Sequence, residues 1–221
     1  MSIVQEIQEF AKTTLVTLLD NICSGFEENE LAYLSAQTKN EMQIRDKIAW
    51  QLHKEITKKY GNRYIVRREW APQGSGRKKV DLAILEMDDS LMSIVHIIAL
   101  VEFKAQSIVR KEKWYIDEFK HDVEKMRELA QKDTDLYFVF IETGQDRKAD
   151  EYKSILGYAA YQTPKASYYS EPNYLSAIEE HWKEFQSVNN QIDISKPKAI
   201  CIGEAYGYKQ YISPLLIGPI K

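Results

Sequence analysis

The feature that most constrains the fold is the run LMSIVHIIALVEFKA, from Leu91 to Ala105. It is too rich in β-branched residues and too uniformly apolar for a strand with one face in water, and it is typical of a strand buried on both faces. Such strands occur in sheets that are covered by helices on both sides. The sequence therefore predicts an α/β fold with a mixed central sheet flanked by helices.

The rest of the chain divides into helical and extended segments by the spacing of its apolar residues. Helices are predicted over 3–22, 28–36, 111–131, 150–161 and 173–186, with a further helix through Ile44, Ile48, Leu52 and Ile56 that ends near Gly61. Strands are predicted over 63–70, 80–87, 91–105 and 135–143, and a last strand over 198–203. A turn at Asp88-Asp89 makes the second and third strands a hairpin, and the helical crossover makes the strands at 91–105 and 135–143 parallel neighbours.

The length of 221 residues suits one compact unit. Within it we expect an N-terminal helical extension (1–37), a core (38–144) and a C-terminal extension of helix and strand packed on that core (145–221). The acidic, helical N-terminus is neither a secretory signal nor a bilayer span, so no membrane partner and a cytoplasmic location are expected. With two isolated cysteines and no HExxH motif, the chain offers no recognisable zinc site.

The chemistry is predicted at the charged end of the long apolar strand. An acidic residue followed two positions later by lysine occurs four times in the chain, but only Glu102-Phe103-Lys104 terminates a buried strand. Strand periodicity places Glu102, Lys104 and Gln106 on one face. Charges in that position need partners or a metal, because burying an unpaired charge is costly.

Asp81 supplies a second carboxylate, early in the preceding strand. The hairpin at Asp88-Asp89 would bring Asp81 and Glu102 together, and two carboxylates at close range repel each other. A hard divalent cation such as Mg²⁺, which takes oxygen ligands, relieves that repulsion. Two carboxylates and a nearby lysine are suited to phosphodiester hydrolysis.

These residues carry a family resemblance. Val80-Asp81 and, with twenty residues between the two acids, Val101-Glu102-Phe103-Lys104-Ala105 resemble the signature of the PD-(D/E)XK nuclease superfamily, with valine where the family name has proline. The resemblance covers roughly residues 38–143 and implies a restriction-endonuclease-like αβββαβ core. It also implies a Mg²⁺-dependent endonuclease acting on DNA in restriction, repair or phage defence.

The resemblance assigns roles to individual residues. It implies that Asp81, Glu102 and the backbone carbonyl of Phe103 hold Mg²⁺, for which Mn²⁺ can substitute, and that Lys104 acts on the attacking water or the phosphate. A glutamate on the first core helix often joins such sites, which makes Glu41 a further catalytic and metal-binding candidate, and Gln106 is a further catalytic candidate. Glu41 has an equal alternative role as the fourth residue of a capping box, Thr38-Lys39-Asn40-Glu41.

Basic residues are concentrated around the predicted site although the net charge is −3. Residues 54–113 hold thirteen basic and eight acidic side chains, which favours a phosphate-bearing partner. Candidate DNA contacts are Arg77, Lys78 and Lys79 in a glycine-containing loop and Lys120 and Lys125 on the following helix; an ordinary turn and a solvated helix face are the alternatives. No Walker motif is present, so no nucleotide cofactor is expected.

Two other functions remain open at this point. One is a catalytically silent nucleic-acid-binding or assembly module with the same fold, against which the intact set of Asp81, Glu102 and Lys104 argues. The other is an α/β protein in which the charged cluster is a set of structural ion pairs. A homodimer is compatible with either function.

Overall fold

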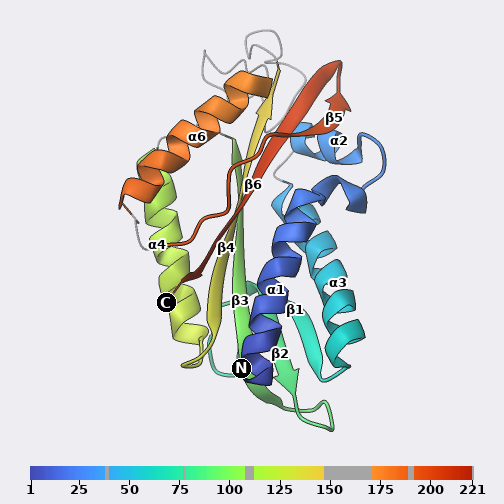
Figure 1. Ribbon diagram of the computed structural model, residues 1–221, viewed down its shortest axis with the longest axis vertical. Coiled ribbons are helices and arrows are strands. Elements are labelled where there is room, and N and C mark those ends of the chain that lie inside the picture. Colours follow the sequence, from blue (N-terminus) through green and yellow to red (C-terminus); the bar gives the residue numbers. More distant parts are fainter. Residues whose placement is uncertain (38–39, 77, 108–111, 147–170, 189–191, 221) are drawn as a thin grey trace.

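The computed structural model describes residues 1–37, 40–76, 78–107, 112–146, 171–188 and 192–220. The described elements are α1 (Ile3–Asp20), the 3₁₀ turn η1 (Ile22–Gly25), α2 (Glu30–Gln37), α3 (Glu41–Tyr60), β1 (Tyr64–Trp70), β2 (Val80–Met87), β3 (Ile94–Ser107), α4 (Glu112–Leu129), β4 (Asp135–Gln145), α6 (Glu171–Val188), β5 (Ile200–Ala205) and β6 (Tyr208–Ile220). The strands form one mixed six-stranded sheet in the order β1-β2-β3-β4-β6-β5. Helices α1, α2 and α3 lie on one side of the sheet, and α4 and α6 lie on the other (Figure 1).

The long strand β3 is buried on both faces, as predicted. Val101, Phe103 and Ala105 pack into the core beneath α1 and α3, whereas Leu100 packs into the core beneath α4 and α6. The strand begins at Ile94 rather than Leu91, because Leu91 and Met92 lie exposed in the turn that follows β2. The predicted pairings are confirmed: β2 and β3 are antiparallel, and β3 and β4 are parallel.

The C-terminal part of the sheet differs from the prediction. The strand predicted over 198–203 corresponds to β5, but it is not the last strand, because β6 follows it and lies between β4 and β5. β6 pairs with β4 from Leu136–Ile220 to Gln145–Gln210. The end of the chain therefore forms an interior strand of the sheet, and the helix predicted over 150–161 lies outside the described residues.

Within the described residues, no helix combines the length and the apolar character needed to cross a membrane.

Candidate active site

The candidate site lies where β2 and β3 part. The last registered pair toward this end is Leu82 with Val101, and β3 continues to Ser107 beyond the start of β2. Acidic side chains accept the β3 amides there: Phe103 N–H donates to Asp81 Oδ2 at 2.8 Å, and Ala105 N–H donates to Glu41 Oε2 at 2.8 Å. These carboxylates thus accept β3 amide hydrogen bonds that the carbonyl groups of a neighbouring strand would otherwise accept.

Asp81 and Glu102 lie next to each other at this end of the β2–β3 pair, with Asp81 in contact with α3 and Glu102 in contact with α4. Each is one residue beyond the last registered pair, Leu82–Val101, on its own strand. The amide of Asp81 lies 3.4 Å from Glu102 Oε2, and the two side chains are only 14% and 8% exposed. The hairpin therefore brings the two carboxylates together as the sequence predicts.

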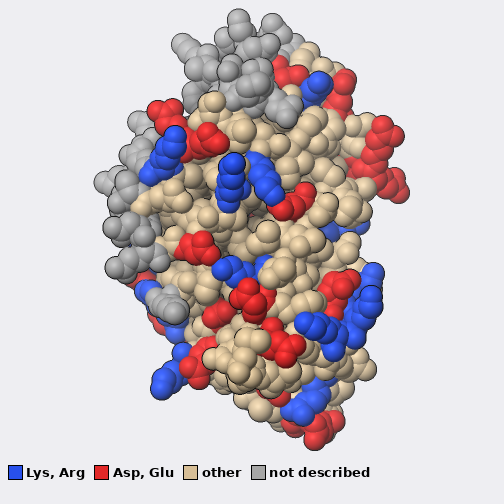
Figure 2. Space-filling model, in the orientation of Figure 1, with Lys and Arg blue, Asp and Glu red and all other residues tan. Residues whose placement is uncertain are grey.

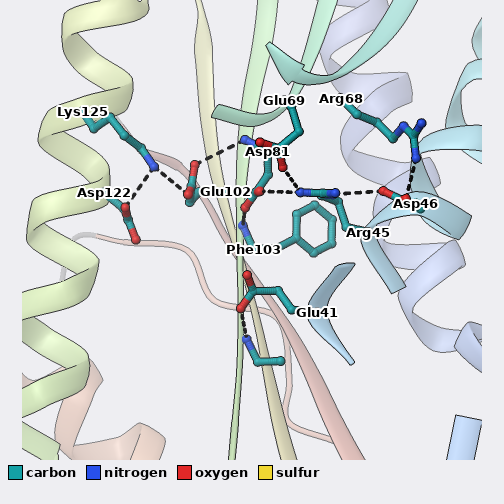
Figure 3. A network of polar contacts seen from close by, with 11 residues as sticks. Glu41, Arg45, Asp46, Arg68, Glu69, Asp81, Glu102, Phe103, Asp122 and Lys125 are labelled. Carbon is teal, nitrogen blue, oxygen red and sulfur yellow. Dashed lines mark hydrogen bonds and ion pairs between the residues drawn. The ribbon is translucent and has the colours of Figure 1, made fainter. Parts of the chain in front are cut away.

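A row of charged side chains crosses the sheet through this pair, from α4 on one side to α3 and β1 on the other (Figure 3). In order, it consists of Asp122, Lys125, Glu102, Asp81, Arg45, Asp46 and Arg68. Lys125 Nζ lies 3.0 Å from Asp122 and 2.6 Å from Glu102, and Arg45 lies 3.0 Å from Asp81 and 3.1 Å from Asp46. Arg68 also pairs with Asp46. Charges alternate along the row except between Glu102 and Asp81, where two acids are neighbours.

Burial and the neighbouring acid together change the protonation of Glu102. Burial, reinforced by the neighbouring carboxylate of Asp81, raises the pKa of Glu102 to about 8, although Lys125 opposes the shift. A cation between Asp81 and Glu102 would favour the ionised form of Glu102. The junction of these two acids is therefore the place in the row where an added positive charge fits.

The donors at the junction suit a hard cation. Asp81 and Glu102 supply carboxylate oxygens, and the carbonyl of Phe103 lies on the same edge of β3 as its amide, because both groups of a strand residue point the same way. Oxygen donors of this kind are the ligands that Mg²⁺ takes in proteins. Among the described residues, no group of three or more His, Cys, Asp or Glu side chains converges as a metal site.

Lys104 lies on the same face as Glu102, but its amine is directed toward α4. Its Nζ atom lies 3.3 Å from both Glu118 and Asp122. Burial disfavours the ammonium, but the carboxylates of Asp122 and Glu118 outweigh that effect and raise the pKa of Lys104. The amine in contact with Glu102 is that of Lys125.

The helix α4 supplies buried charges rather than only a solvated face. Asp122 is 3% exposed and the Lys125 side chain is 18% exposed, so the solvated-face interpretation is wrong for Lys125; Lys120 is exposed, which fits either interpretation. The reason is position, since Asp122 lies three residues after Phe119 and four before Met126, both of which are buried.

The other predicted site residues have varied placements. Glu41 is the first residue of α3 and contacts β3, and Asn40 holds the cap position without a side-chain capping hydrogen bond. Thr38 and Lys39, with which the predicted capping box begins, lie outside the described residues. In the basic loop, Lys78 pairs with Glu128 of α4 and Lys79 is exposed. Arg77 and the side chain of Gln106 lie outside the described residues.

Arg45 is a site residue that the sequence reasoning missed. It is 7% exposed and pairs with Asp81, Asp46 and Glu69. The signal was present, because Arg45 lies three residues before Ile48 on the apolar stripe of the helix. A charged residue on a core-facing stripe requires a buried partner, and Asp81 is that partner.

Scans against protein-family models, curated proteins and solved structures each found no significant match to this chain.

Proposed function

We propose that the chain is a divalent-metal-dependent nuclease that hydrolyses DNA phosphodiester bonds, with Asp81 and Glu102 as the carboxylates that hold the metal. The observation that carries the proposal is the junction of two buried carboxylates in a row of otherwise alternating charges. A metal-binding pair at the end of a central strand is a common basis for attack on a phosphate ester, whereas a purely structural row gains nothing from two adjacent acids.

The order of elements supports the resemblance to PD-(D/E)XK nucleases. α3, β1, β2, β3, α4 and β4 follow one another in the αβββαβ order that the resemblance implies, with Asp81 on β2 and Glu102 on β3. Glu41, at the start of the first of these helices, contacts β3 two residues beyond Phe103. The arrangement thus agrees with a restriction-endonuclease-like core, which we include in the proposal.

In this proposal Asp81, Glu102 and the Phe103 carbonyl would hold Mg²⁺, or Mn²⁺ in its place. Such a metal would lower the pKa of a bound water and neutralise negative charge on the phosphate. Arg45 and the Phe103 amide fix the two oxygens of Asp81, so this carboxylate keeps one orientation. Lys125 and Lys104 bring positive charge to the α4 side of the pair, where it stabilises charge that develops on the phosphate oxygens.

A second candidate is a catalytically silent binding module with the same fold. The observation that favours it is that each carboxylate already has a cationic partner, Arg45 for Asp81 and Lys125 for Glu102. In that case the row would be a set of structural ion pairs, and neither Mg²⁺ nor the identity of Glu102 would affect any reaction.

The test is incubation of the purified chain with plasmid, linear duplex and single-stranded DNA, in Mg²⁺ or in EDTA. We expect cleavage in Mg²⁺ only, and its loss in Glu102→Gln. Glu86→Gln is the matched control, because Glu86 is a half-buried acid on β2 that pairs with Arg63 near the opposite end of the β2–β3 ladder. Equal activity of wild type and Glu102→Gln would overturn the assignment of the site, and no cleavage of any substrate would favour the binding module.

A further inference from the structure

We propose that the groove between α3 and β1 binds an unpaired nucleotide of the nucleic-acid strand that enters the Asp81–Glu102 site, with its base stacked on Trp50. This inference rests on the proposed nuclease function. It adds the class of substrate, a strand that is single-stranded beside the point of cleavage.

The groove has the size of a ligand site, with a volume of about 670 Å³. One wall comes from α3, with Asp46, Trp50 and His53, and the other from β1, with Arg67, Arg68 and Glu69. Charges are interleaved over the face that Figure 2 shows, so a phosphate chain has no continuous basic surface to follow there.

Trp50 is the feature that points to a base. Its side chain is 62% exposed, whereas Trp70 and Trp182 are buried in the core. The ring lies beside His53, with the centroids 6.2 Å apart and the planes tilted by 39°. An exposed indole in a groove offers a flat aromatic face for stacking. Any nucleobase can stack on such a face, whatever the sequence of the strand.

The surroundings of Trp50 carry positive charge for phosphates. Lys54 and Lys58 follow Trp50 at four-residue intervals on α3, so the three side chains lie on one side of the helix. Both lysines are exposed, and neither forms an ion pair with any described residue. Arg68, from β1, pairs with Asp46 and keeps further donors of its guanidinium available. The groove therefore matches an anionic strand better than a neutral peptide.

The groove adjoins the proposed site at Arg45. Arg45 lines the groove and also donates to Asp81 at 3.0 Å, so it separates the groove from the carboxylate pair (Figure 3). Trp50 lies one helical turn beyond Asp46, about 6 Å along the helix axis. A strand with a phosphate at Asp81 and Glu102 can therefore place a neighbouring nucleotide at Trp50. Bases inside a duplex are already stacked on one another, so the nucleotide at Trp50 must be unpaired.

The experiment measures affinity of the full chain in EDTA for oligo-dT, oligo-rU and a DNA duplex of equal length, by fluorescence anisotropy. We expect Trp50→Ala to weaken binding of both single strands by about 5- to 100-fold and to affect duplex binding less. Trp50→Phe keeps an aromatic face and should retain most of the affinity. Lys54→Ala should reduce the slope of log K against log salt concentration by about 0.7, the value for one phosphate contact on a single strand.

Tyr33→Ala is the matched control, since Tyr33 is a 54% exposed aromatic residue on α2, outside the groove. Unchanged affinity in Trp50→Ala, or an equal loss for single strands and duplex, would overturn the inference. A dimer that dissociates on Trp50→Ala would also overturn it, because a second copy would then cover the indole. Tight, Trp50-dependent binding without any cleavage in Mg²⁺ would uphold the groove while the nuclease proposal fails. Cleavage by the wild type in Mg²⁺ together with unaltered binding by Trp50→Ala would uphold the nuclease proposal, while the inference about the groove would fail.

Discussion

Binding of Mg²⁺ at the carboxylate pair should release a proton from Glu102. Burial and the charge of Asp81 raise the pKa of Glu102 to about 8, so at pH 6.5 this carboxyl is mostly protonated. A metal needs the ionised form, so binding at pH 6.5 should release about one proton, and at pH 9 about 0.1. The apparent affinity should rise about tenfold for each pH unit up to pH 8 and then level off.

The stability of the metal-free protein should also depend on pH through Glu102. The folded state holds the Glu102 proton between the ordinary pKa of 4.5 and about 8, whereas the unfolded chain loses it at the lower value. In this window the folded state binds more protons, so the contribution of Glu102 to stability falls as the pH rises and is constant above pH 8. Saturating Mg²⁺ should remove this loss, because it stabilises the ionised form.

Isothermal titration calorimetry in two buffers of different ionisation enthalpy measures the released protons directly. Glu102→Gln should abolish the proton release and weaken Mg²⁺ binding, while Glu86→Gln should leave both unchanged. Tight Mg²⁺ binding at pH 6.5 with an enthalpy that does not depend on the buffer would refute this reasoning, since Glu102 would then already be ionised or would not be a ligand.

Three further predictions concern the site and the core. Asp81→Asn and Lys104→Ala should each abolish DNA cleavage, and excess Mn²⁺ should restore some activity only to Asp81→Asn, because that variant loses a ligand charge whereas Lys104→Ala keeps the metal ligands. Arg45→Met should lower the free energy of unfolding by about 3–5 kcal/mol, measured in urea, because Asp81 loses its buried partner, and Mg²⁺ should recover part of the loss. Gly144→Ala should destabilise by about 1–3 kcal/mol, because a Cβ atom there would lie 2.5 Å from the buried ring of Tyr174.

Each of these predictions has a result that would contradict it. Gly25→Ala is the control for Gly144→Ala, because the nearest atom to its Cβ would be Lys47 Cβ at 3.6 Å, and equal stability of the two variants would contradict the packing argument. For Arg45→Met, a loss of stability that Mg²⁺ leaves unchanged would argue for a purely structural ion pair. Retained cleavage in both Asp81→Asn and Lys104→Ala would place the active site elsewhere.

The part of the fold around β3 could be predicted because it depends on local patterns. A long apolar run with a helical crossover to 135–143 allows few alternatives to a parallel pair inside a covered sheet, and the turn at Asp88-Asp89 leads to a hairpin. The same patterns place Asp81 beside Glu102. Both conclusions require only strand periodicity and register.

The strand β6 could not be predicted in the same way. It contains Pro214, Gly218 and Pro219, which mark turns and strand edges in most sequences, and yet it lies inside the sheet between β4 and β5. Its position depends on pairing with β4, more than sixty residues earlier in the chain. Local propensity contains no information about such a partner.

The partners of the charged residues were the least predictable part of the site. Strand periodicity places Lys104 on the face of Glu102, but its amine turns to Glu118 and Asp122 because α4 packs over that end of β3. Arg45 and Asp122 were detectable as charges on apolar helix stripes. Which acid or base each would meet depends on how α3 and α4 dock on the sheet, and a single sequence does not specify this docking.

The most direct test of the central claim is a crystal structure of the chain soaked in Mn²⁺, with anomalous diffraction to locate the ion. The account predicts one anomalous peak between Asp81 and Glu102, at about 2.0–2.2 Å from a carboxylate oxygen of each and within ligand distance of the Phe103 carbonyl. We expect Lys125 or Arg45 to move away from its carboxylate as the ion enters. Well-ordered crystals that show no peak at the pair, with the Lys125–Glu102 and Arg45–Asp81 ion pairs intact, would contradict the claim.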